Sequence, residues 1–385
     1  MMDLETAVHF ESKYLMHAYK RSNILLTEGN GVYVTDSSGK TYLDFVGGIG
    51  TCLIGHGNKN FASVLREQAS KLIGVSNLYY TEQQLFLAER LCKLSGGKRV
   101  FFSNSGTEAN ECAFKLARLC TKKTKVISVE GGFHGRTYGS LSATYAKKYR
   151  NGFEPLVSGF LVVEDNLKAI ENAVDENTAA VIIECIQGEA GIKLHENNYL
   201  KQLRKLTAEK NVLLIIDEIQ TGNGRTGEYF AFQHAGITPD LITLSKGLAN
   251  GIPIAATIST AAELDFQISL HGSTFGGNSL ACAAANYVID YVLKHELMKN
   301  AADSGNYFMS KLKQLDSPMV KEVRGKGLMI GVELNQEAEE AVRKCEEKGL
   351  LVNCVNKTTL RFLPALIATK NDVDNALEIL AGVLK

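Results

Sequence analysis

Leu241 to Gly251 read LITLSKGLANG, and this stretch decides the fold. Leu241 to Leu244 are apolar or β-branched, which predicts a short buried strand. The strand ends at Ser245, so Lys246 stands just past it with Gly247 behind. A lysine held there, next to apolar walls, can have a lowered pKa and act as a neutral amine that forms a Schiff base. Taken alone the pattern is weak, because most lysines that follow strands are solvated.

A second strand end, about 30 residues upstream, strengthens this interpretation. Asn211 to Gln220 read NVLLIIDEIQ, in which the apolar run Val212 to Ile216 predicts a strand buried on both faces and Asp217 follows it. A gap of about 30 residues matches one βαβ unit, so Asp217 and Lys246 are expected at the same edge of one parallel sheet. An acid and a lysine at that edge suit pyridoxal phosphate, because the lysine forms the imine and the carboxylate keeps the pyridine nitrogen protonated.

Composition limits the classes of protein. The chain has 385 residues, 42 Lys+Arg against 42 Asp+Glu, and 45% hydrophobic residues. The zero formal charge suggests neither a nucleic-acid nor a membrane partner. No apolar run approaches the length of a membrane span, and the N-terminus has no signal-peptide core. The eight cysteines form no CxxC pair and no His/Cys cluster, so no metal site is predicted and a cytoplasmic location with reduced thiols is expected.

Strands and helices alternate through the first three quarters of the chain. Further apolar runs end near residues 102, 129 and 183, and helical spacing separates most of them. This alternation predicts an α/β fold with a large, doubly wound, mostly parallel sheet and a site at the carboxyl ends of its strands. From about residue 297 the pattern becomes α+β. The expected domains are an N-terminal arm and hairpin packing with the small domain (1–45), a large domain (46–290) and a small C-terminal domain (291–385).

An anion site is indicated where the strand RVFFS runs into Asn104-Ser105-Gly106-Thr107. Ser105 and Glu108 have the spacing of a capping box for the helix that follows. The free N–H groups and the positive dipole end of that helix favour a bound anion. A capped helix without any ligand is the competing interpretation, and this motif alone does not separate the two.

Three other segments bear on whether a flat, charged ligand binds here. Phe133 and Arg136 lie in a glycine-rich loop, where one offers a ring for stacking and the other a planar fork for a carboxylate. Arg361 lies in an apolar strand and requires a carboxylate partner. Gly222 to Gly227 match G-x-G-x-x-G, but they begin about five residues after the strand ends, which is too late for a dinucleotide fingerprint.

With these residues laid out, the chain resembles the class III pyridoxal-phosphate-dependent aminotransferases, from about residue 20 to the end. The motifs that carry the resemblance occur in the family's order: NSGTEANE (104–111), GGFHGRT (131–137), QGEAG (187–191), DEIQTGNGRTG (217–227), SKGL (245–248), HGSTFGGN (271–278), RGKGLMIG (324–331) and LRFLP (360–364). The resemblance implies the type I fold of pyridoxal-phosphate-dependent transferases.

The resemblance also implies roles for individual residues. Catalysis would rest on Lys246, which would form the Schiff base, and on Asp217, which would pair with the pyridine nitrogen. The residues implied in cofactor binding are Ser105, Gly106, Thr107, Phe133, Asp217, Glu218, Ile219, Gln220, Lys246 and Thr274. The residues implied in substrate binding are Arg136, Glu189, Ser273 and Arg361.

The implied reaction moves an amino group from an ω-amino donor to 2-oxoglutarate. Glu189 would neutralise Arg361 while the donor is bound and release it for the keto acid, and Arg136 would bind a carboxylate of both substrates. Thr274 would reach the phosphate bound to a partner subunit, which implies a homodimer with shared active sites. Two other classes stay open: a nucleotide-binding oxidoreductase, supported only by residues 222–227, and a non-catalytic interaction protein on the same fold.

Overall fold

The computed structural model describes residues 2–385, and its centre is a seven-stranded sheet in the order β4-β12-β11-β10-β7-β5-β6. Strand β12 runs antiparallel to both neighbours, and the other six strands are parallel to one another. The predicted mostly parallel sheet is thereby confirmed. Its strands are β4 (Arg99–Ser103), β5 (Lys125–Val129), β6 (Phe160–Val163), β7 (Thr178–Glu184), β10 (Leu213–Asp217), β11 (Leu241–Leu244) and β12 (Ala255–Ser259).

Both faces of this sheet are buried. Successive side chains of a strand point to opposite sides, so each strand packs against helices on both faces. On one face, Ile182 and Ile215 pack with Phe114 of helix α5 (Gly106–Thr121). On the other face, Ile183 and Ile216 pack with Leu203 of helix α9 (Asn197–Glu209). Residues 180–183 and 213–216 are therefore apolar without alternation, which is the pattern expected of a doubly wound sheet.

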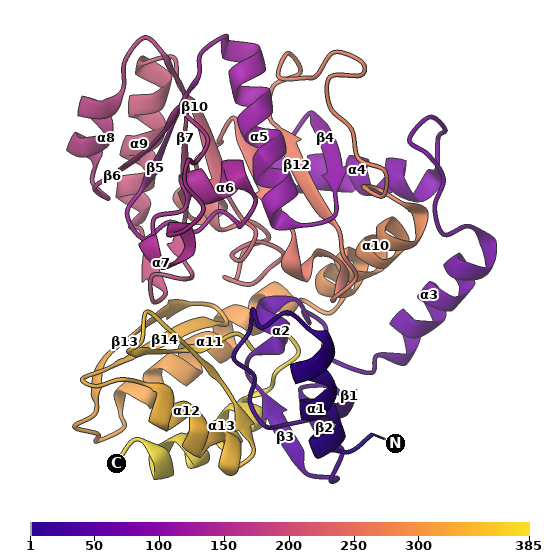
Figure 1. Ribbon diagram of the computed structural model, residues 1–385, viewed down its shortest axis with the longest axis vertical. Coiled ribbons are helices and arrows are strands. Elements are labelled where there is room, and N and C mark those ends of the chain that lie inside the picture. The colour runs from indigo at the N-terminus through magenta and orange to yellow at the C-terminus, as the bar shows by residue number, and fades with distance from the viewer. Residues whose placement is uncertain (1) are drawn as a thin grey trace.

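Further helices surround the sheet (Figure 1). Their bounds are α3 (Lys59–Lys71), α4 (Glu82–Ser95), α6 (Tyr138–Ala143), α7 (Lys147–Arg150), α8 (Leu167–Ala173) and α10 (Ser279–Lys294), with the 3₁₀ turns η1 (Ala231–Ala235) and η2 (Lys246–Ala249). A two-stranded ribbon, β8 (Ile186–Gln187) with β9 (Lys193–Leu194), carries the loop between residues 187 and 193.

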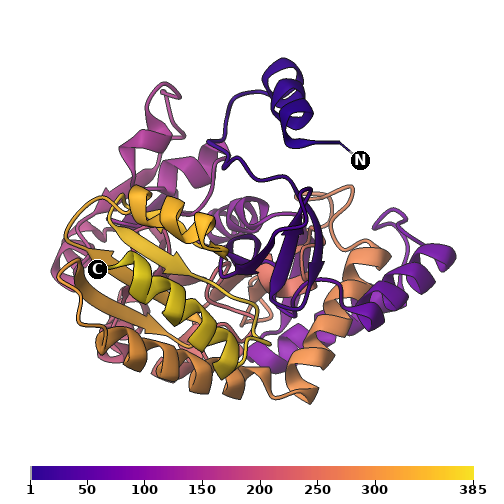
Figure 2. The same cartoon turned by 90° about the horizontal axis from the view of Figure 1, so that it is seen from below.

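The N-terminal segment and the C-terminal part of the chain lie side by side below the large sheet (Figure 1), and Figure 2 shows the C-terminal helices layered there. A four-stranded sheet has the order β13 (Val320–Lys326), β14 (Met329–Leu334), β17 (Thr359–Phe362), β16 (Asn353–Val355). Its helices are α11 (Leu297–Lys313), α12 (Glu339–Glu347) and α13 (Lys370–Val383). The N-terminal helix α1 (Leu4–Tyr14) buries no residue and stands off the body.

A third sheet joins the beginning of the chain to its end. The strands β1 (Leu26–Asn30), β2 (Tyr33–Asp36) and β3 (Thr41–Asp44) form an antiparallel meander, and β15 (Leu350–Leu351) pairs parallel with β3. The sequence predicts one short strand at 350–353, but the structure divides it, because β15 pairs with the N-terminal meander and β16 pairs with β17. The exact domain boundaries at residues 45 and 290 stay a prediction.

A charged pair fastens the segment that leads from β3 into the large sheet. Asp44 accepts backbone N–H bonds from Val46 and Gly47 at the short turn α2 (Gly47–Gly50), and its other oxygen lies 2.8 Å from Nε2 of His56. This hydrogen bond to Asp44, with a second contribution from the Cys52 thiol, raises the pKa of His56 to about 10. The protonated imidazole therefore stabilises the native state.

This pair predicts an alkaline loss of stability. The stabilisation should be fully present below pH 6.5, the ordinary pKa of histidine, and should disappear as the pH rises through about 10. We expect His56→Gln to lower the free energy of unfolding by about 1 kcal/mol at pH 7, since the ring is partly solvated, and to change it little at pH 10.5. Urea unfolding of both proteins at the two pH values measures the difference. An equal loss at both would contradict the charged state of His56.

Candidate active site

Lys246 and Asp217 meet at the carboxyl edge of the large sheet. Strands β10 and β11 are parallel neighbours, and Asp217 is in register with Thr243, three residues before Lys246. The backbone of Lys246 has a φ of +42°, a left-handed conformation that is uncommon outside glycine. Such strained positions are maintained by the surrounding structure and cluster at functional sites. The spacing in the sequence predicted this adjacency, and the left-handed turn is what directs the chain away from the strand at the lysine.

The Lys246 side chain is partly buried, and its amine is free of hydrogen bonds to residues 2–385. Burial lowers the pKa of Lys246 first, and the guanidinium of Arg361 lowers it further, while nearby carboxylates, led by Asp217, oppose the shift. Among residues 2–385, none accepts a hydrogen bond from Nζ of Lys246. A larger fraction of this side chain is therefore a neutral amine near neutral pH than for an exposed lysine, and the amine is available for reaction.

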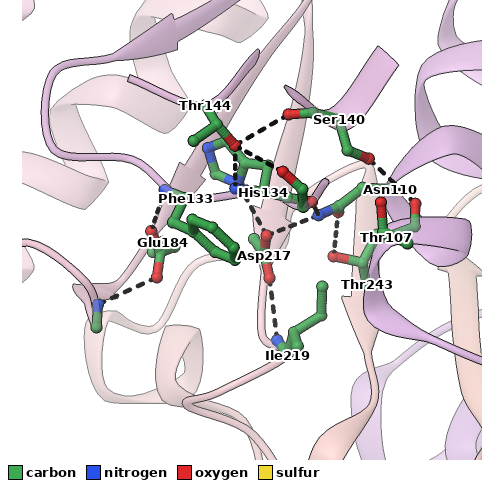
Figure 3. Close-up of polar contacts among 12 residues, drawn as sticks. Thr107, Asn110, Phe133, His134, Ser140, Thr144, Glu184, Asp217, Ile219 and Thr243 are labelled. Carbon is green, nitrogen blue, oxygen red and sulfur yellow. Dashed lines mark hydrogen bonds and ion pairs between the residues drawn. The ribbon is translucent and has the colours of Figure 1, made fainter. Parts of the chain in front are cut away.

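Asp217 is 3% exposed, and three hydrogen-bond partners hold its side chain in place (Figure 3). The side-chain amide of Asn110 donates to Oδ2 at 2.9 Å, and the Nδ1–H of His134 donates to the same oxygen at 2.8 Å. The backbone N–H of Ile219 donates to Oδ1 at 3.1 Å. Three hydrogen bonds fix the orientation of the carboxyl group. Thr243 in turn donates to Oδ1 of Asn110, so the amide cannot rotate freely.

Asn110 and His134 were not predicted from the sequence as site residues. Asn110 lies on the buried face of α5, where an amide among alanines and leucines needs a buried partner. A polar residue on the apolar face of the predicted helix was the signal in the sequence that could have identified Asn110. His134 lies between glycines, and its backbone N–H donates to the hydroxyl of Thr144 at 3.0 Å. Nothing in the local pattern around His134 distinguished it from a core histidine.

Glu184 was also not identified, although it lies beside Asp217 at the end of β7. Its carboxylate accepts the backbone N–H of Phe133 at 3.0 Å and that of Gly188 at 3.2 Å. Burial, with the neighbouring Asp217 carboxylate, raises the pKa of Glu184 to about 7. Glu184 thus ties the loop that carries Phe133 to the loop that carries Glu189.

The start of α5 provides a cradle for an anion. Ser105 caps the helix, and the first-turn N–H groups of Gly106 and Thr107 have no acceptor among residues 2–385. A Cβ on Gly106 would lie 2.8 Å from the side chain of Ile219, so only glycine allows these segments to approach so closely. The hydroxyls of Thr107 and Thr137 lie 2.6 Å apart at the rim. This donor set fits a phosphate group.

The predicted capping box forms only in part. The hydroxyl of Ser105 accepts the N–H of Glu108 at 3.4 Å. The Glu108 carboxylate accepts the N–H of Asn104 at 3.0 Å and the Ser105 hydroxyl at 2.8 Å, and no bond to the Ser105 N–H is present among the described residues. The Glu108 carboxylate therefore fixes the residue before the cap, which holds the strand-to-helix turn at the cradle.

The side chains of Glu218 and Gln220, which come after Asp217 in the chain, have different partners. The Glu218 carboxylate accepts the Thr221 hydroxyl at 2.5 Å and the N–H of Phe232 at 2.9 Å, and burial raises its pKa to about 7. The backbone N–H of Glu218 donates to Thr243 and its carbonyl accepts from Gly222, so the cofactor contact predicted for Glu218 finds no free donor there and stays a prediction. Gln220 instead lies beside Arg361, whose Nη1 donates a hydrogen bond of 3.3 Å to Oε1 of Gln220.

Glu189 and Arg361 form an ion pair of 2.6 Å between an oxygen and Nη1. Arg361 is 2% exposed, and Asn353 accepts from its Nε at 3.3 Å. Burial raises the pKa of Glu189, but the Arg361 guanidinium more than offsets this, so the pKa lies below its ordinary value. The carboxylate partner required by Arg361 is therefore Glu189. That the pair acts as a switch stays a prediction.

The remaining predicted substrate residues lie apart in this chain. Arg136 is exposed and close to Phe133, whereas Ser273 lies against Asn104, whose amide donates to its hydroxyl at 3.2 Å. Among residues 2–385, no hydrogen bond joins Ser273 to Arg136. Thr274 is exposed. The implied roles of Ser273 and Thr274 stay predictions.

Neither metal-binding groups nor membrane-spanning helices are present among residues 2–385. Within this range no group of three His, Cys, Asp or Glu side chains is arranged to hold a metal ion. In the same range no helix is both long and apolar enough to cross a bilayer.

Comparison with known proteins identifies the family. The chain matches the model of aminotransferase class III over residues 14–384. The chain belongs to the class III aminotransferases. The prediction of an aminotransferase with pyridoxal phosphate as cofactor is thereby confirmed at the level of the family, and an aminotransferase acts on an amino donor and a keto-acid acceptor.

Individual relatives of this class III aminotransferase cover almost the whole chain. The acetylornithine aminotransferase of Aquifex aeolicus is 48% identical over 380 residues, which cover 96% of this chain and 100% of that protein. The acetylornithine aminotransferase of Caldanaerobacter subterraneus is 45% identical over 387 residues, with 98% of each covered. Among solved structures, the ornithine aminotransferase of Toxoplasma gondii, with pyridoxal phosphate at partial occupancy, is similar with a TM-score of 0.96 and 32% identity. That match covers 99% of this chain and 94% of that one.

Proposed function

We propose that the chain is an acetylornithine aminotransferase. It would transfer the terminal amino group of N2-acetyl-L-ornithine to 2-oxoglutarate, giving N-acetyl-L-glutamate 5-semialdehyde and L-glutamate, a step of arginine biosynthesis. The observation that carries the proposal is the name shared by relatives that are 41–48% identical over nearly the full chain. The free amine of the partly buried Lys246 beside Asp217 supports the chemistry.

The residues of the site suit pyridoxal phosphate. The α5 cradle would hold the phosphate, Phe133 would lie against the ring, and Asp217 would pair with the ring nitrogen. When bound, the cofactor supplies an aldehyde that reacts with amines and a ring that withdraws electrons. Lys246 would then carry the proton removed from the donor carbon, acting first as base and then as acid, because its amine is free and its pKa is lowered.

The two arginines account for two substrates of different charge. N-acetylornithine presents one carboxylate, which Arg136 would bind, while Glu189 keeps Arg361 neutralised. 2-Oxoglutarate presents two carboxylates, so Arg136 would bind the distal one and Arg361 the one next to the keto group. Glu189 would have to leave the guanidinium for this to happen. The equilibrium between paired and released Arg361 would therefore decide which substrate the site accepts.

Glu189→Gln tests this switch. We expect kcat/KM for N-acetylornithine to fall about 10-fold, because an un-neutralised Arg361 disfavours a donor with no charge there, and KM for 2-oxoglutarate to fall. Without 2-oxoglutarate the variant should melt at a lower temperature, since a buried guanidinium has lost its counter-charge. Steady-state kinetics and thermal melting measure these changes. The surface variant Glu209→Gln is the control, and unchanged kinetics for both substrates would exclude the switch.

We also propose that the chain works as a homodimer in the cytoplasm. A hollow of about 1240 Å³ runs between residues 73–78 and 268–278, and it exposes Leu78, Ile268 and Phe275 beside Thr274. Monomers rarely expose so much clustered apolar surface. A partner there would bring Ser273 and Thr274 to a second site. All eight cysteines are unpaired, which supports a reducing compartment.

A second donor deserves the same assay. The similarity in structure to ornithine aminotransferase is high, with a TM-score of 0.96. N-succinyl-diaminopimelate and 4-aminobutyrate would use the same machinery, and nothing observed favours them over the other two.

Visible absorption of the purified protein, loaded with pyridoxal phosphate, separates these possibilities. Addition of N-acetylornithine without keto acid should bleach the cofactor band, and 2-oxoglutarate should restore it. If only ornithine bleaches the band, the chemistry stands and the proposed donor is wrong. If no band forms even with added cofactor, the proposed role of Lys246 fails.

A further inference from the structure

Tyr149, at the end of the short helix α7, lies against the arginine that we propose binds carboxylates. The guanidinium carbon of Arg136 is 4.0 Å from the centroid of the Tyr149 ring and 5.7 Å from that of Phe133. The two rings meet edge to face, with their centroids 5.5 Å apart and 75° between their planes. The ammonium of Lys148 is 4.8 Å from the same tyrosine ring. Tyr149 thus contacts both the ring expected beside the cofactor and the guanidinium.

This contact leaves the binding edge of Arg136 free. A guanidinium on an aromatic ring is attracted through its charge and its flat face, whereas its N–H donors lie in the plane of the group. Among residues 2–385, none forms a hydrogen bond or ion pair with the Arg136 guanidinium. Arg136 is therefore held in place by aromatic contact, and all its donors stay available to a ligand.

The two arginines of the site are consequently held by different means. Arg361 is neutralised by Glu189, so a carboxylate binds there only after that partner leaves. Arg136 has no carboxylate partner that an incoming carboxylate would have to displace. An aromatic partner orients a cation without reducing its charge, which suits a group that must bind every substrate of both half-reactions.

We propose that Tyr149 is a positioning residue for Arg136 and thereby sets the affinity of the site for substrate carboxylates. The inference rests on the proposed function in one respect, namely that Arg136 binds a carboxylate. The contact requires the ring of Tyr149 and not its hydroxyl, because among the described residues the hydroxyl makes no hydrogen bond.

Tyr149→Leu and Tyr149→Phe test the proposal in the two separate half-reactions of the loaded enzyme, glutamate with the pyridoxal form and 2-oxoglutarate with the pyridoxamine form. Each is followed by visible absorbance, and KM and kcat are those of the half-reaction. We expect Tyr149→Leu to raise KM for both about 3- to 20-fold while kcat changes less than about 3-fold, and Tyr149→Phe to keep KM near that of the wild type. If Tyr149→Leu does not fold, as judged by melting temperature, Tyr149→Met takes its place in the same comparison.

A double-mutant cycle with Arg136→Ala distinguishes positioning from general packing. If Tyr149 acts through Arg136, Tyr149→Leu should change KM no further once Arg136 is alanine. A full additional effect in the Arg136→Ala background would overturn the proposal, as would an unchanged KM in Tyr149→Leu or an equal defect in Tyr149→Phe. Because the cycle uses glutamate, a failure of N-acetylornithine to react would reject the proposed donor and leave this test intact.

Discussion

Lys246→Ala is expected to abolish transamination, with a loss of at least about 10⁴-fold in kcat. The variant lacks the only amine that the large sheet presents beside Asp217 among residues 2–385, so the proton on the donor carbon has no acceptor of suitable pKa. The fold should survive, because removing an amine that makes no hydrogen bond to the described residues leaves no partner unsatisfied. Stopped-flow absorbance of the donor half-reaction and thermal melting measure the two effects separately.

Lys93→Ala is the matched control, since this lysine is exposed on α4 and pairs only with Glu89 on the same helix. It should keep full activity and a melting temperature within a few degrees of the wild type. Turnover of Lys246→Ala above about 1% of the wild-type rate would contradict the role of Lys246 in proton transfer. A large drop in melting temperature would instead identify Lys246 as a packing residue.

Asp217→Asn should reduce kcat by about 10²- to 10³-fold, because the substitution keeps the shape of the side chain and removes the charge opposite the ring nitrogen. It also replaces one acceptor oxygen by an NH₂ group. If the amide oxygen keeps the bonds to Asn110 and His134, the NH₂ group faces the N–H of Ile219, so stability should fall by about 1–3 kcal/mol. Steady-state kinetics in saturating cofactor and urea unfolding measure the two losses.

Asp290→Asn controls for the loss of a carboxylate elsewhere, since Asp290 forms an exposed pair with Arg90 on the surface. The stability of that variant should change by less than about 1 kcal/mol. If Asp217→Asn kept near wild-type kcat while losing stability, the network in Figure 3 would be structural, and Asp217 would have no electrostatic role in the reaction.

The large sheet was predictable because its strands are buried on both faces. A continuous apolar run such as residues 212–216 marks a strand without knowledge of its neighbours, and the spacing to Lys246 then predicts which edge carries the site. Strand β13 was not predictable in this way. Its sequence, VKEVRGK, is half charged, since β13 is an edge strand that buries few side chains.

The secondary structure of residues 138–174 could not be predicted from the sequence, for a different reason. The sequence YGSLSA forms the buried helix α6, yet glycine and serine have low helix propensity and no apolar periodicity is present. Burial among neighbours, not local preference, makes this helix. Strand β6 and helix α8 were also not predicted, because they are short and bury few side chains.

Partners across the fold were the least predictable part of the site. Asn110 and His134 meet at Asp217 although they come from α5 and from the loop after β5. Their types are compatible with many roles, and only the packing of that helix and loop on the sheet edge selects one. The pair of Glu189 and Arg361 was expected from family resemblance, whereas local sequence showed only that Arg361 required a carboxylate.

The pairing of β15 with β3 has a consequence for how the chain is made. About 300 residues separate these strands, so the N-terminal meander emerges from the ribosome long before its fourth strand exists. At 5–20 residues per second the delay is roughly 15–60 s, during which the edge of β3 stays open. The first segment synthesised is therefore among the last to be fixed, and a chain truncated before residue 350 leaves that edge exposed to other chains.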